Sequence, residues 1–370
     1  MPSAAIALRN IQAPTDPALP ATDGAVPSGV VERAQTCRPL GRTGRAALLS
    51  AALLLAAVLP AAANAQPTQA ADAEQIVDAL RANAGHLPHI RPTFAKGQCV
   101  TGGFEPSGEA AHVTRSVSFT RPGRITGRFS VGGGNPAVAD TNRAVLRGFS
   151  FRIETGDAAS EFLMENAPVH FARSQDQMLA FLRARAPGPG GSPDPARVRT
   201  FSEANDETLN QARFVAGRPF PGSFAGTTYW GVHAYPATNA QGATRFIKFK
   251  VVPAEGEVTL SDEEARSRPG DFLQRDLEQR VAARRVRFDV LALLARPGDQ
   301  TTDVTLRWPD EDAHEAVRLG SIAITALEPN ETCDAGFFDP SRLAEGIGLP
   351  TDDIFVARLT AYAISFGKRR

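Results

Sequence analysis

Several residue types are scarce in this chain of 370 residues. It has three cysteines, and none of them stands in a C-x-x-C or zinc-type spacing, which argues against a cysteine metal site. Neither sign of charge is in excess, since Lys+Arg and Asp+Glu both number 40, so no global field points to nucleic acid or membrane. Tyr (3) and Trp (2) are rare beside 21 Phe. Because Phe has no polar group, this bias indicates a dry core or an apolar ligand pocket.

Familiar binding motifs are also missing. The glycine triplet 132–134 is not followed by Lys-Ser/Thr, so it indicates a turn or a bulge rather than a phosphate loop. The acidic groups 262–264 and 310–312 lack the spacing of a calcium loop and are typical of a helix start and a turn. Adjacent residues do not face each other on a helix or strand, which also disfavours paired catalytic carboxylates.

The N-terminal part has the layout of a secretory signal peptide. Residues 46–62 form one apolar run without charge, and Ala63-Asn64-Ala65 gives an A-x-A cleavage site. Three arginines precede the run: Arg38, Arg42 and Arg45. We therefore expect a leader over 1–65, a mature domain over 66–370, and a periplasmic or secreted protein. An uncleaved anchor is the alternative, since the run is barely long enough to span a bilayer.

Two cysteines, Cys99 and Cys333, belong to the expected mature chain. In an oxidising compartment they could form a disulfide. Two separate buried thiols fit the sequence equally well, and a free-thiol count on denatured, unreduced protein decides between them.

Hydrophobic periodicity predicts an α+β fold. Strands are expected at 115–120, 125–131, 145–154, 227–235, 245–253, 286–292, 304–308 and 317–327. Helices are expected at 72–84, 174–184, 203–215, after the capping box of Ser261 and Glu264, and at 353–366. Strands in succession with helices inserted, and no βαβ alternation, indicate a barrel-like antiparallel sheet closed by a final helix.

The final helix carries a pair of residues suited to iron chemistry. Arg358 and Tyr362 are four residues apart, so they share one helix face within side-chain reach. A phenol ionises near pH ~10, and a nearby guanidinium favours the phenolate, as a ferric ion on the oxygen would. The pair suits an anionic oxygen ligand for haem iron. The ordinary alternative is a tyrosine packed beneath an arginine on an amphipathic helix.

A series of short motifs follows in order from about Arg91 to Arg369. They are Arg91 with Phe94-Ala95-Lys96-Gly97, Arg128-Phe129-Ser130, Arg147-Gly148-Phe149, Asn166-Ala167-Pro168-Val169-His170-Phe171, Trp308-Pro309, Phe338-Asp339-Pro340, Gly346-Ile347, and Arg358 through Tyr362. In this series the chain resembles the haem catalases, and more closely the shorter catalase-related peroxidases. The resemblance implies a catalase-type antiparallel β-barrel with inserted helices, haem b as cofactor, and a C-terminal helix that carries the haem ligand.

The resemblance also assigns roles to individual residues. It implies that Tyr362 is the iron ligand and Arg358 its partner. It places Arg91, Arg128 and Arg369 at the haem propionates, which is physically sensible because carboxylates in an apolar cleft need charged partners.

One departure from the family pattern concerns the distal histidine, whose place Phe94 takes. None of the six histidines repairs this by a small shift, and His170 is expected to be an ordinary core or surface imidazole. Loss of a proton-transfer group typically costs ~10²–10⁴ in rate. Asn166 is then expected to donate a hydrogen bond to peroxide, and Ser130 to orient a water.

These expectations together describe an exported haem peroxidase. It would reduce organic hydroperoxides, and hydrogen peroxide weakly, with an unidentified external reductant. Nucleic acid is not expected as a partner, nor is membrane after signal cleavage. The sequence allows a homo-oligomer but does not give the oligomeric state. The alternatives are a hydroperoxide-rearranging haem enzyme, a non-catalytic periplasmic haem-binding protein, and a haem-free barrel that binds lipid or carbohydrate.

Overall fold

A computed structural model of the protein describes residues 70–370. The predicted leader, its cleavage site and Cys37 lie outside these residues. The described part belongs to one compact unit, which begins at Ala65. Within it, every helix is too short or too polar to cross a bilayer.

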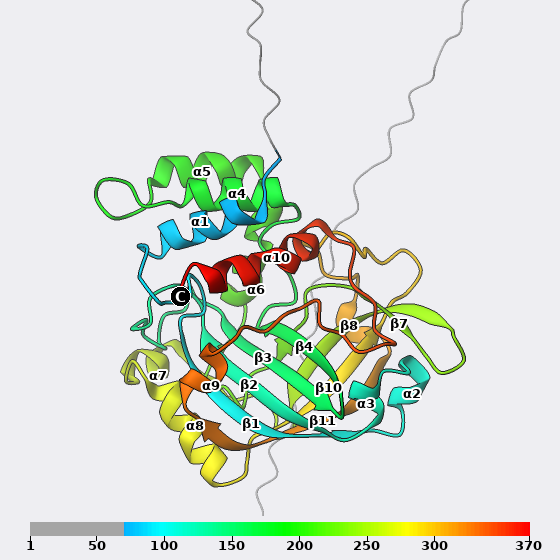
Figure 1. The fold of residues 1–370 in the computed structure, drawn as a ribbon. Helices are drawn as coiled ribbons and strands as arrows, with labels where there is room; N and C mark the ends of the chain where they lie inside the picture. The colour runs from blue at the N-terminus through cyan, green and yellow to red at the C-terminus, as the bar shows by residue number, and fades with distance from the viewer. Residues whose placement is uncertain (1–69) are drawn as a thin grey trace, which may run out of the picture. The chain divides into compact units, whose positions relative to one another are not determined.

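The centre of the fold is an antiparallel sheet that closes into a barrel. Nine strands follow the order β10-β11-β1-β2-β3-β4-β6-β8-β7, and β10 also pairs with β8, so β7 alone stays outside the ring (Figure 1). The strands are β1 Lys96–Pro106, β2 Gly123–Val131, β3 Arg147–Thr155, β4 Ala158–Glu165, β6 Tyr229–Trp230, β7 Tyr235–Thr238, β8 Thr244–Pro253, β10 Arg287–Leu294 and β11 Ala316–Glu328. The short strands β5 Phe220–Pro221 and β9 Thr259–Leu260 form a separate ribbon.

Helices cover the outside of the barrel. α10 (Asp353–Gly367) runs across its upper end, with α1 (Ala73–Asn83), α4 (Gln175–Ala184) and α5 (Pro195–Ala204) stacked beyond it (Figure 1). The other helical segments are α2 Ala110–Val113, α3 Val117–Thr120, η1 Asp206–Leu209, α6 Asn210–Ala216, α7 Asp262–Ser267, α8 Phe272–Ala282, η2 Glu311–Ala313 and α9 Asn330–Asp334. The capping box predicted at Ser261 and Glu264 is present at the start of α7.

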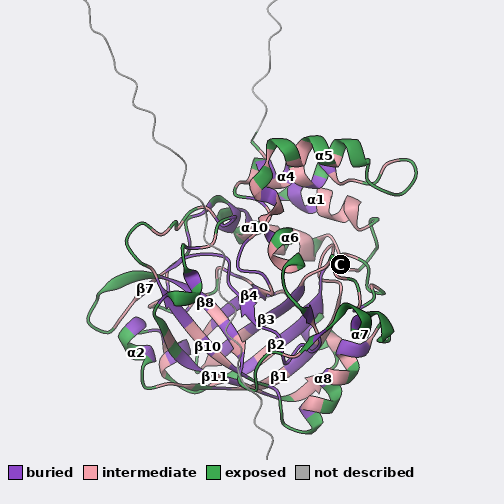
Figure 2. Cartoon of the chain, turned by 180° about the vertical axis from the view of Figure 1, so that it is seen from behind, coloured by how far each residue is buried: buried purple, intermediate pink, exposed green. Residues whose placement is uncertain are grey.

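The interior of the barrel is filled by phenylalanine. Phe129 and Phe149 stack with ring centroids 4.3 Å apart, and Phe288 lies 5.4 Å from Phe149. All three are fully buried, and the barrel strands in Figure 2 alternate between the buried and the intermediate colour. Phenylalanine thus forms a dry core inside the barrel.

Three predicted strands differ from the structure. Residues 117–120 form the helix α3, because Phe119 packs against Phe104 and Phe249 and this burial overrides the β propensity of the segment. The predicted strand 227–235 is broken into β6 and β7, with residues 231–234 outside both.

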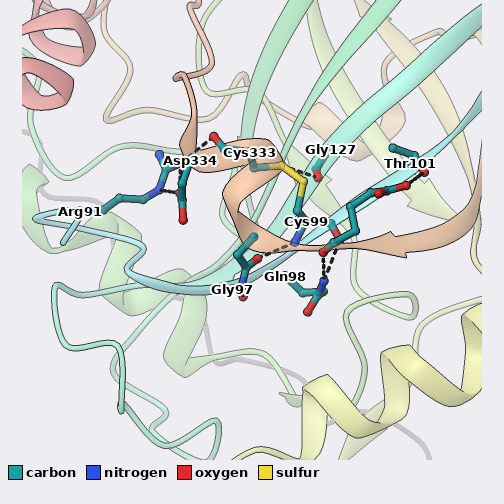
Figure 3. Close-up of a disulfide and its surroundings, with 10 residues drawn as sticks. Arg91, Gly97, Gln98, Cys99, Thr101, Gly127, Cys333 and Asp334 are labelled. Atoms are coloured by element: carbon teal, nitrogen blue, oxygen red, sulfur yellow. Dashed lines mark hydrogen bonds and ion pairs between the residues drawn. A yellow bond between two sulfur atoms is a disulfide. The ribbon is translucent and has the colours of Figure 1, made fainter. Parts of the chain in front are cut away.

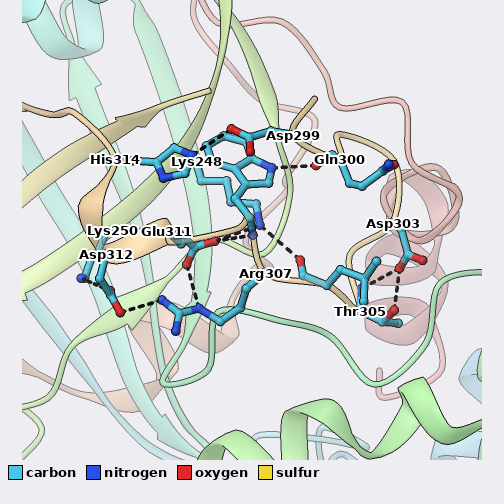
Figure 4. A network of polar contacts seen from close by, with 12 residues as sticks. Lys248, Lys250, Asp299, Gln300, Asp303, Thr305, Arg307, Glu311, Asp312 and His314 are labelled. Carbon is cyan, nitrogen blue, oxygen red and sulfur yellow. Dashed lines mark hydrogen bonds and ion pairs between the residues drawn. The ribbon is translucent and has the colours of Figure 1, made fainter. Parts of the chain in front are cut away.

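The predicted strand 304–308 is instead irregular. The Asp303 carboxylate accepts from the amide and hydroxyl of Thr305, and the Trp308 indole N–H donates to the Gln300 carbonyl at 2.7 Å (Figure 4). Such local side-chain bonds offer the backbone an alternative to a ladder of strand hydrogen bonds. Burial of Trp308 under Lys248, 4.9 Å from its ring centre, then fixes the loop.

Cys99 on β1 and Cys333 on α9 form a disulfide, with their Cα atoms 5.8 Å apart (Figure 3). Of the two alternatives left open by the sequence, the structure therefore has the bonded one. The bond ties the start of the barrel to a segment 234 residues later. It lies next to Arg91, which donates to the Cys333 carbonyl.

Candidate functional site

A cavity of about 490 Å³ is lined by barrel strands β2 to β4 and by helices α1, α4 and α10. This volume is within the ~300–1,000 Å³ typical of ligand pockets. Much of the lining is apolar, including Ile76, Phe94, Phe171, Phe181, Ile354 and Phe366. Polar groups gather at a few places only, and each place has a distinct chemistry.

The first polar group is the pair on α10. Arg358 donates to the Tyr362 hydroxyl oxygen from Nε at 3.1 Å and from Nη2 at 2.8 Å, as the four-residue spacing predicts. Both side chains line the cavity. Burial opposes the charge of Arg358, but Tyr362 and Tyr235 outweigh it and the pKa of Arg358 is raised. Two donated hydrogen bonds from a permanent cation fix the position of the Tyr362 oxygen relative to Arg358.

Two residues that the sequence did not reveal hold Arg358 in place. Arg358 Nη1 lies 2.6 Å from His233 Nε2, and His233 Nδ1 lies 2.8 Å from a carboxylate oxygen of Asp352. Burial lowers the pKa of His233, so its imidazole is neutral, with Nδ1–H donating to Asp352 and Nε2 accepting from Arg358. The other carboxylate oxygen of Asp352 caps α10 by accepting from Phe355 N at 2.9 Å.

This chain of contacts was hard to find in the sequence because His233 and Asp352 are separated by 119 residues. The one available signal was an aspartate directly before the predicted helix 353–366, where an N-cap is expected. The partner of its second carboxylate oxygen depends on how β6 leads into β7.

The second polar group is a cluster of three arginines, Arg91, Arg128 and Arg369, which all line the cavity. Arg91 pairs with Asp334 at 2.6 Å (Figure 3), and Arg128 donates to the carbonyls of Phe94 and Ala95. Burial and then the charge of Arg91 lower the pKa values of Arg128 and Arg369 to about 10.

The charge of this cluster is not balanced by its own neighbours. Three guanidinium groups and the single carboxylate of Asp334 leave a net charge of +2 (three minus one). The Nε atom of Arg128 is buried and has no hydrogen-bond partner among residues 70–370. A ligand with two carboxylates would neutralise this excess and satisfy the free donor.

The third feature is the wall around Phe94. Phe94 has a φ of 51°, in the left-handed region that a bulky residue rarely adopts. Its ring lies against Gly148, where an added Cβ would come within 3.1 Å of the ring and 2.7 Å of Ser130 Oγ. The structure thus brings the predicted residues Phe94 and Ser130 together on the cavity wall.

Asn166 is the predicted site residue that the structure places elsewhere. Its side-chain oxygen accepts from Arg147 N at 2.8 Å, and it lines a smaller pocket beside Arg147 and Phe220. The residues that precede it on β4, Met164 and Glu165, line the large cavity. Asn166 is therefore not among the residues that line the large cavity, and its expected hydrogen bond to a peroxide stays a prediction.

His170 also lines the cavity, although the sequence predicted an ordinary core or surface imidazole. Its Nδ1 lies 3.0 Å from the Ala172 carbonyl oxygen and 3.2 Å from the Ala172 amide nitrogen. Burial lowers the pKa of His170 to about 4, so the ring is neutral at pH 7.

Taken together, the cavity fits a flat apolar group that carries a metal and two carboxylates. Tyr362 offers the metal an oxygen ligand, the arginine cluster offers charge to the carboxylates, and apolar side chains surround the space between. These are the features of a haem group.

Comparison with known proteins gives one consistent result. The model of the catalase family matches residues 62–369. The chain is 32% identical to the catalase-related peroxidase of Synechococcus elongatus, over 80% of this chain and 88% of that one. It is 29% identical to the catalase-related peroxidase of Mycolicibacterium paratuberculosis, over 79% of this chain and 93% of that one.

Solved structures agree on the fold. A fungal catalase aligns with a TM-score of 0.68 and catalase A from Saccharomyces cerevisiae with 0.67, both at 22% identity and over 80% of this chain. The chain spans 62% and 64% of the length of those two proteins. The predicted α+β fold on an antiparallel barrel is confirmed.

Proposed function

The chain belongs to the catalase family, among the catalase-related peroxidases, and we propose that it is a haem b enzyme that reduces organic hydroperoxides with electrons from an external donor. Membership of the family establishes a peroxide-acting, haem-binding oxidoreductase. The substrate preference, the donor and the type of haem are our proposal.

In this proposal the residues of the cavity divide the work of holding the cofactor. Tyr362 would bind the iron, Arg358 would hold the phenol oxygen through two hydrogen bonds, and Arg91, Arg128 and Arg369 would hold the propionates. When bound, haem supplies the two electrons that break the peroxide O–O bond. The role of His233 is to hold Arg358 toward Tyr362.

The observation that carries the substrate preference is Phe94. Dismutation of hydrogen peroxide needs two well-placed proton transfers. A phenyl ring cannot act as a base, so its presence in place of the distal base lowers the rate of each step that needs a proton transfer by ~10²–10⁴-fold. An organic hydroperoxide instead gains from burying its apolar part against the cavity, at about 25 cal/mol per Å². Phe94, Phe171 and Phe181 supply that surface.

A two-substrate assay tests this function. Holoprotein is mixed with cumene hydroperoxide or hydrogen peroxide, each with and without a dye reductant, and peroxide loss and dye oxidation are followed together. We expect dye oxidation with cumene hydroperoxide, and little oxygen evolution from hydrogen peroxide. Loss of cumene hydroperoxide without dye oxidation would indicate the rearrangement enzyme instead. Inert haem would indicate a non-catalytic binding protein.

We also propose that the protein works outside the cytoplasm. The disulfide between Cys99 and Cys333 supports an oxidising compartment. The apolar run 46–62 supports export through a signal peptide, which lies outside the described residues. Sequencing the N-terminus of the mature protein from a periplasmic fraction tests this, and a start at Gln66 is expected. An intact N-terminus in the cytoplasmic fraction would refute export.

A further inference from the structure

Glu165 belongs to a row of residues that crosses the cavity wall. Ser130 on β2 pairs with Gly148 on β3, Gly148 pairs with Glu165 on β4, and Glu165 pairs with Trp230 on β6. Directly paired residues share one face of a sheet. Because neighbouring strands lie about 4.8 Å apart, Glu165 is one strand spacing from the glycine that supports the Phe94 ring.

The carboxyl of Glu165 has little to stabilise its charge. In the part of the chain that the structure describes, it forms no ion pair, and its one side-chain hydrogen bond comes from Gln211 Nε2 to Oε2 at 3.3 Å. Burial raises the pKa of Glu165, and the charge of Arg358 opposes this only in part. Desolvation therefore outweighs the attraction of Arg358, and the carboxyl keeps a proton to higher pH than a free glutamate does.

We propose that Glu165 carries the proton in peroxide cleavage, in place of the distal histidine whose position Phe94 occupies. The inference rests on the proposed function and names the residue that makes it work. Its second support is Trp230, which lines the same cavity and whose buried indole N–H has no partner among the described residues. Trp230 is directly paired with Glu165 on the neighbouring strand, and it also lines the smaller pocket beside Arg147.

Peroxide cleavage through Glu165 balances in protons and electrons. For a hydroperoxide ROOH, the Glu165 carboxylate takes the proton of the inner oxygen and returns it to the outer oxygen. The outer oxygen leaves as ROH with the electron pair of the O–O bond. The remaining oxygen is released as water after the external donor supplies two electrons and solvent supplies two protons. Glu165 ends the cycle in its starting form.

His170 is the competing candidate, and it suits the role less well. With its pKa lowered to about 4, roughly one imidazole in a thousand holds a proton at pH 7, whereas an efficient carrier has a pKa near the working pH. The Ala172 backbone also occupies its Nδ1. The charged or titratable side chains around the two candidates are Arg358, His233, Asp352 and Tyr362 toward α10, with Arg91, Arg128 and Arg369 at the arginine cluster.

Cyanide binding to the ferric holoprotein tests this without turnover. Hydrogen cyanide, undissociated at neutral pH, binds iron as the anion, so its proton either stays on a nearby carrier or enters the buffer. Calorimetry in buffers of different ionisation enthalpy counts the released protons. For the wild type we expect the count to fall from one toward zero as pH rises through the pKa of Glu165. In Glu165→Gln, which is isosteric, the count should stay at one throughout.

Two further variants separate the candidates. Glu165→Asp keeps a carboxyl and should restore the pH-dependent count, and His170→Phe should follow the wild type. In peroxide turnover, Glu165→Gln should lose ~10²-fold or more in the rate of cumene hydroperoxide consumption. Equal proton counts in Glu165→Gln and wild type, or a count abolished by His170→Phe alone, would overturn the assignment.

These experiments also distinguish two hypotheses, the peroxidase function and the role of Glu165 as proton carrier. If the wild type oxidises dye and Glu165→Gln does so equally fast, the peroxidase function is supported and the role of Glu165 is refuted. A wild type that retains the cyanide proton but oxidises no dye would support the carrier and refute the peroxidase. Protein that binds no haem would refute both.

Discussion

Substitution of Asp352 by asparagine probes the contacts behind Tyr362. One carboxylate oxygen of Asp352 caps α10 at Phe355 N, and the other accepts from His233 Nδ1. Asparagine has one acceptor and one donor group, so it can keep the cap or the bond to His233, and not both. His233 and Asp352 are each 1% exposed, so water cannot replace the lost partner.

The magnitude follows from this burial. Leaving one buried donor unsatisfied costs about 1–3 kcal/mol, which is the loss of unfolding free energy we expect for Asp352→Asn. Asp352→Ala removes both bonds and should lose a further ~0.5–2 kcal/mol, the usual cost of a missing N-cap. His233 then no longer offers an accepting nitrogen to Arg358, which bonds to the Tyr362 oxygen. We therefore also expect a shift in the absorption spectrum of tyrosine-ligated haem.

Urea unfolding at pH 7 measures the free energies, and Asp271→Asn is the matched control. Asp271 also precedes a helix, but its side chain makes no capping bond and its ion pair with Arg275 is exposed. We expect a change within about 0.5 kcal/mol there. A stability of Asp352→Asn equal to the wild type, or to Asp352→Ala, would refute the division of the two carboxylate oxygens between the cap and His233.

Four shorter predictions concern other parts of the site. Tyr362→Phe should abolish the tyrosine-ligated haem spectrum, and an unchanged spectrum would remove Tyr362 as the iron ligand. Replacing Cys99 and Cys333 by serine together should cost about 2–5 kcal/mol in urea unfolding, and reductant should then have no further effect on the double variant. Phe94→His should raise the initial rate of oxygen evolution from hydrogen peroxide by ~10²-fold or more, because histidine tolerates the left-handed backbone and supplies a base; no increase would count against the place assigned to Phe94. His170 has a folded-state pKa of about 4 against 6.5 unfolded, so about 3 kcal/mol of stability should be lost as pH falls from 6.5 to 4, and this component should disappear from the pH profile of His170→Phe.

Local sequence signals predicted the parts of this fold that are decided locally. The helix with Arg358 and Tyr362 depends on a four-residue spacing, and the α7 capping box on a three-residue spacing, so both could be read from a few neighbouring residues. The prediction of a strand at 304–308 was wrong because its contacts are not local. Trp308 is held by a cation and a carbonyl from distant or looped segments, and no local pattern encodes them.

Asn166 is a site residue predicted from the sequence, whereas in the structure its neighbour Glu165 lines the large cavity. A shift of one residue along a strand moves a side chain to the opposite face. On β4, Leu163, Met164 and Glu165 all line the cavity, although Met164 also belongs to the barrel core. Placing these side chains required a strand at 158–165, whereas the family motif begins at Asn166.

The cavity wall concentrates features that a purely structural core would be expected to eliminate. Phe94 holds a left-handed backbone, and among residues 70–370 Trp230 leaves an indole N–H without a partner and Glu165 is a desolvated carboxyl without an ion pair. Each of these costs on the order of 1–3 kcal/mol. The opposite side is fully satisfied, because Asp352, His233, Arg358 and Tyr362 are linked by hydrogen bonds. This asymmetry has a chemical reason: the ligand oxygen must stay fixed through the whole cycle, whereas the group that moves a proton must be free to gain and lose one.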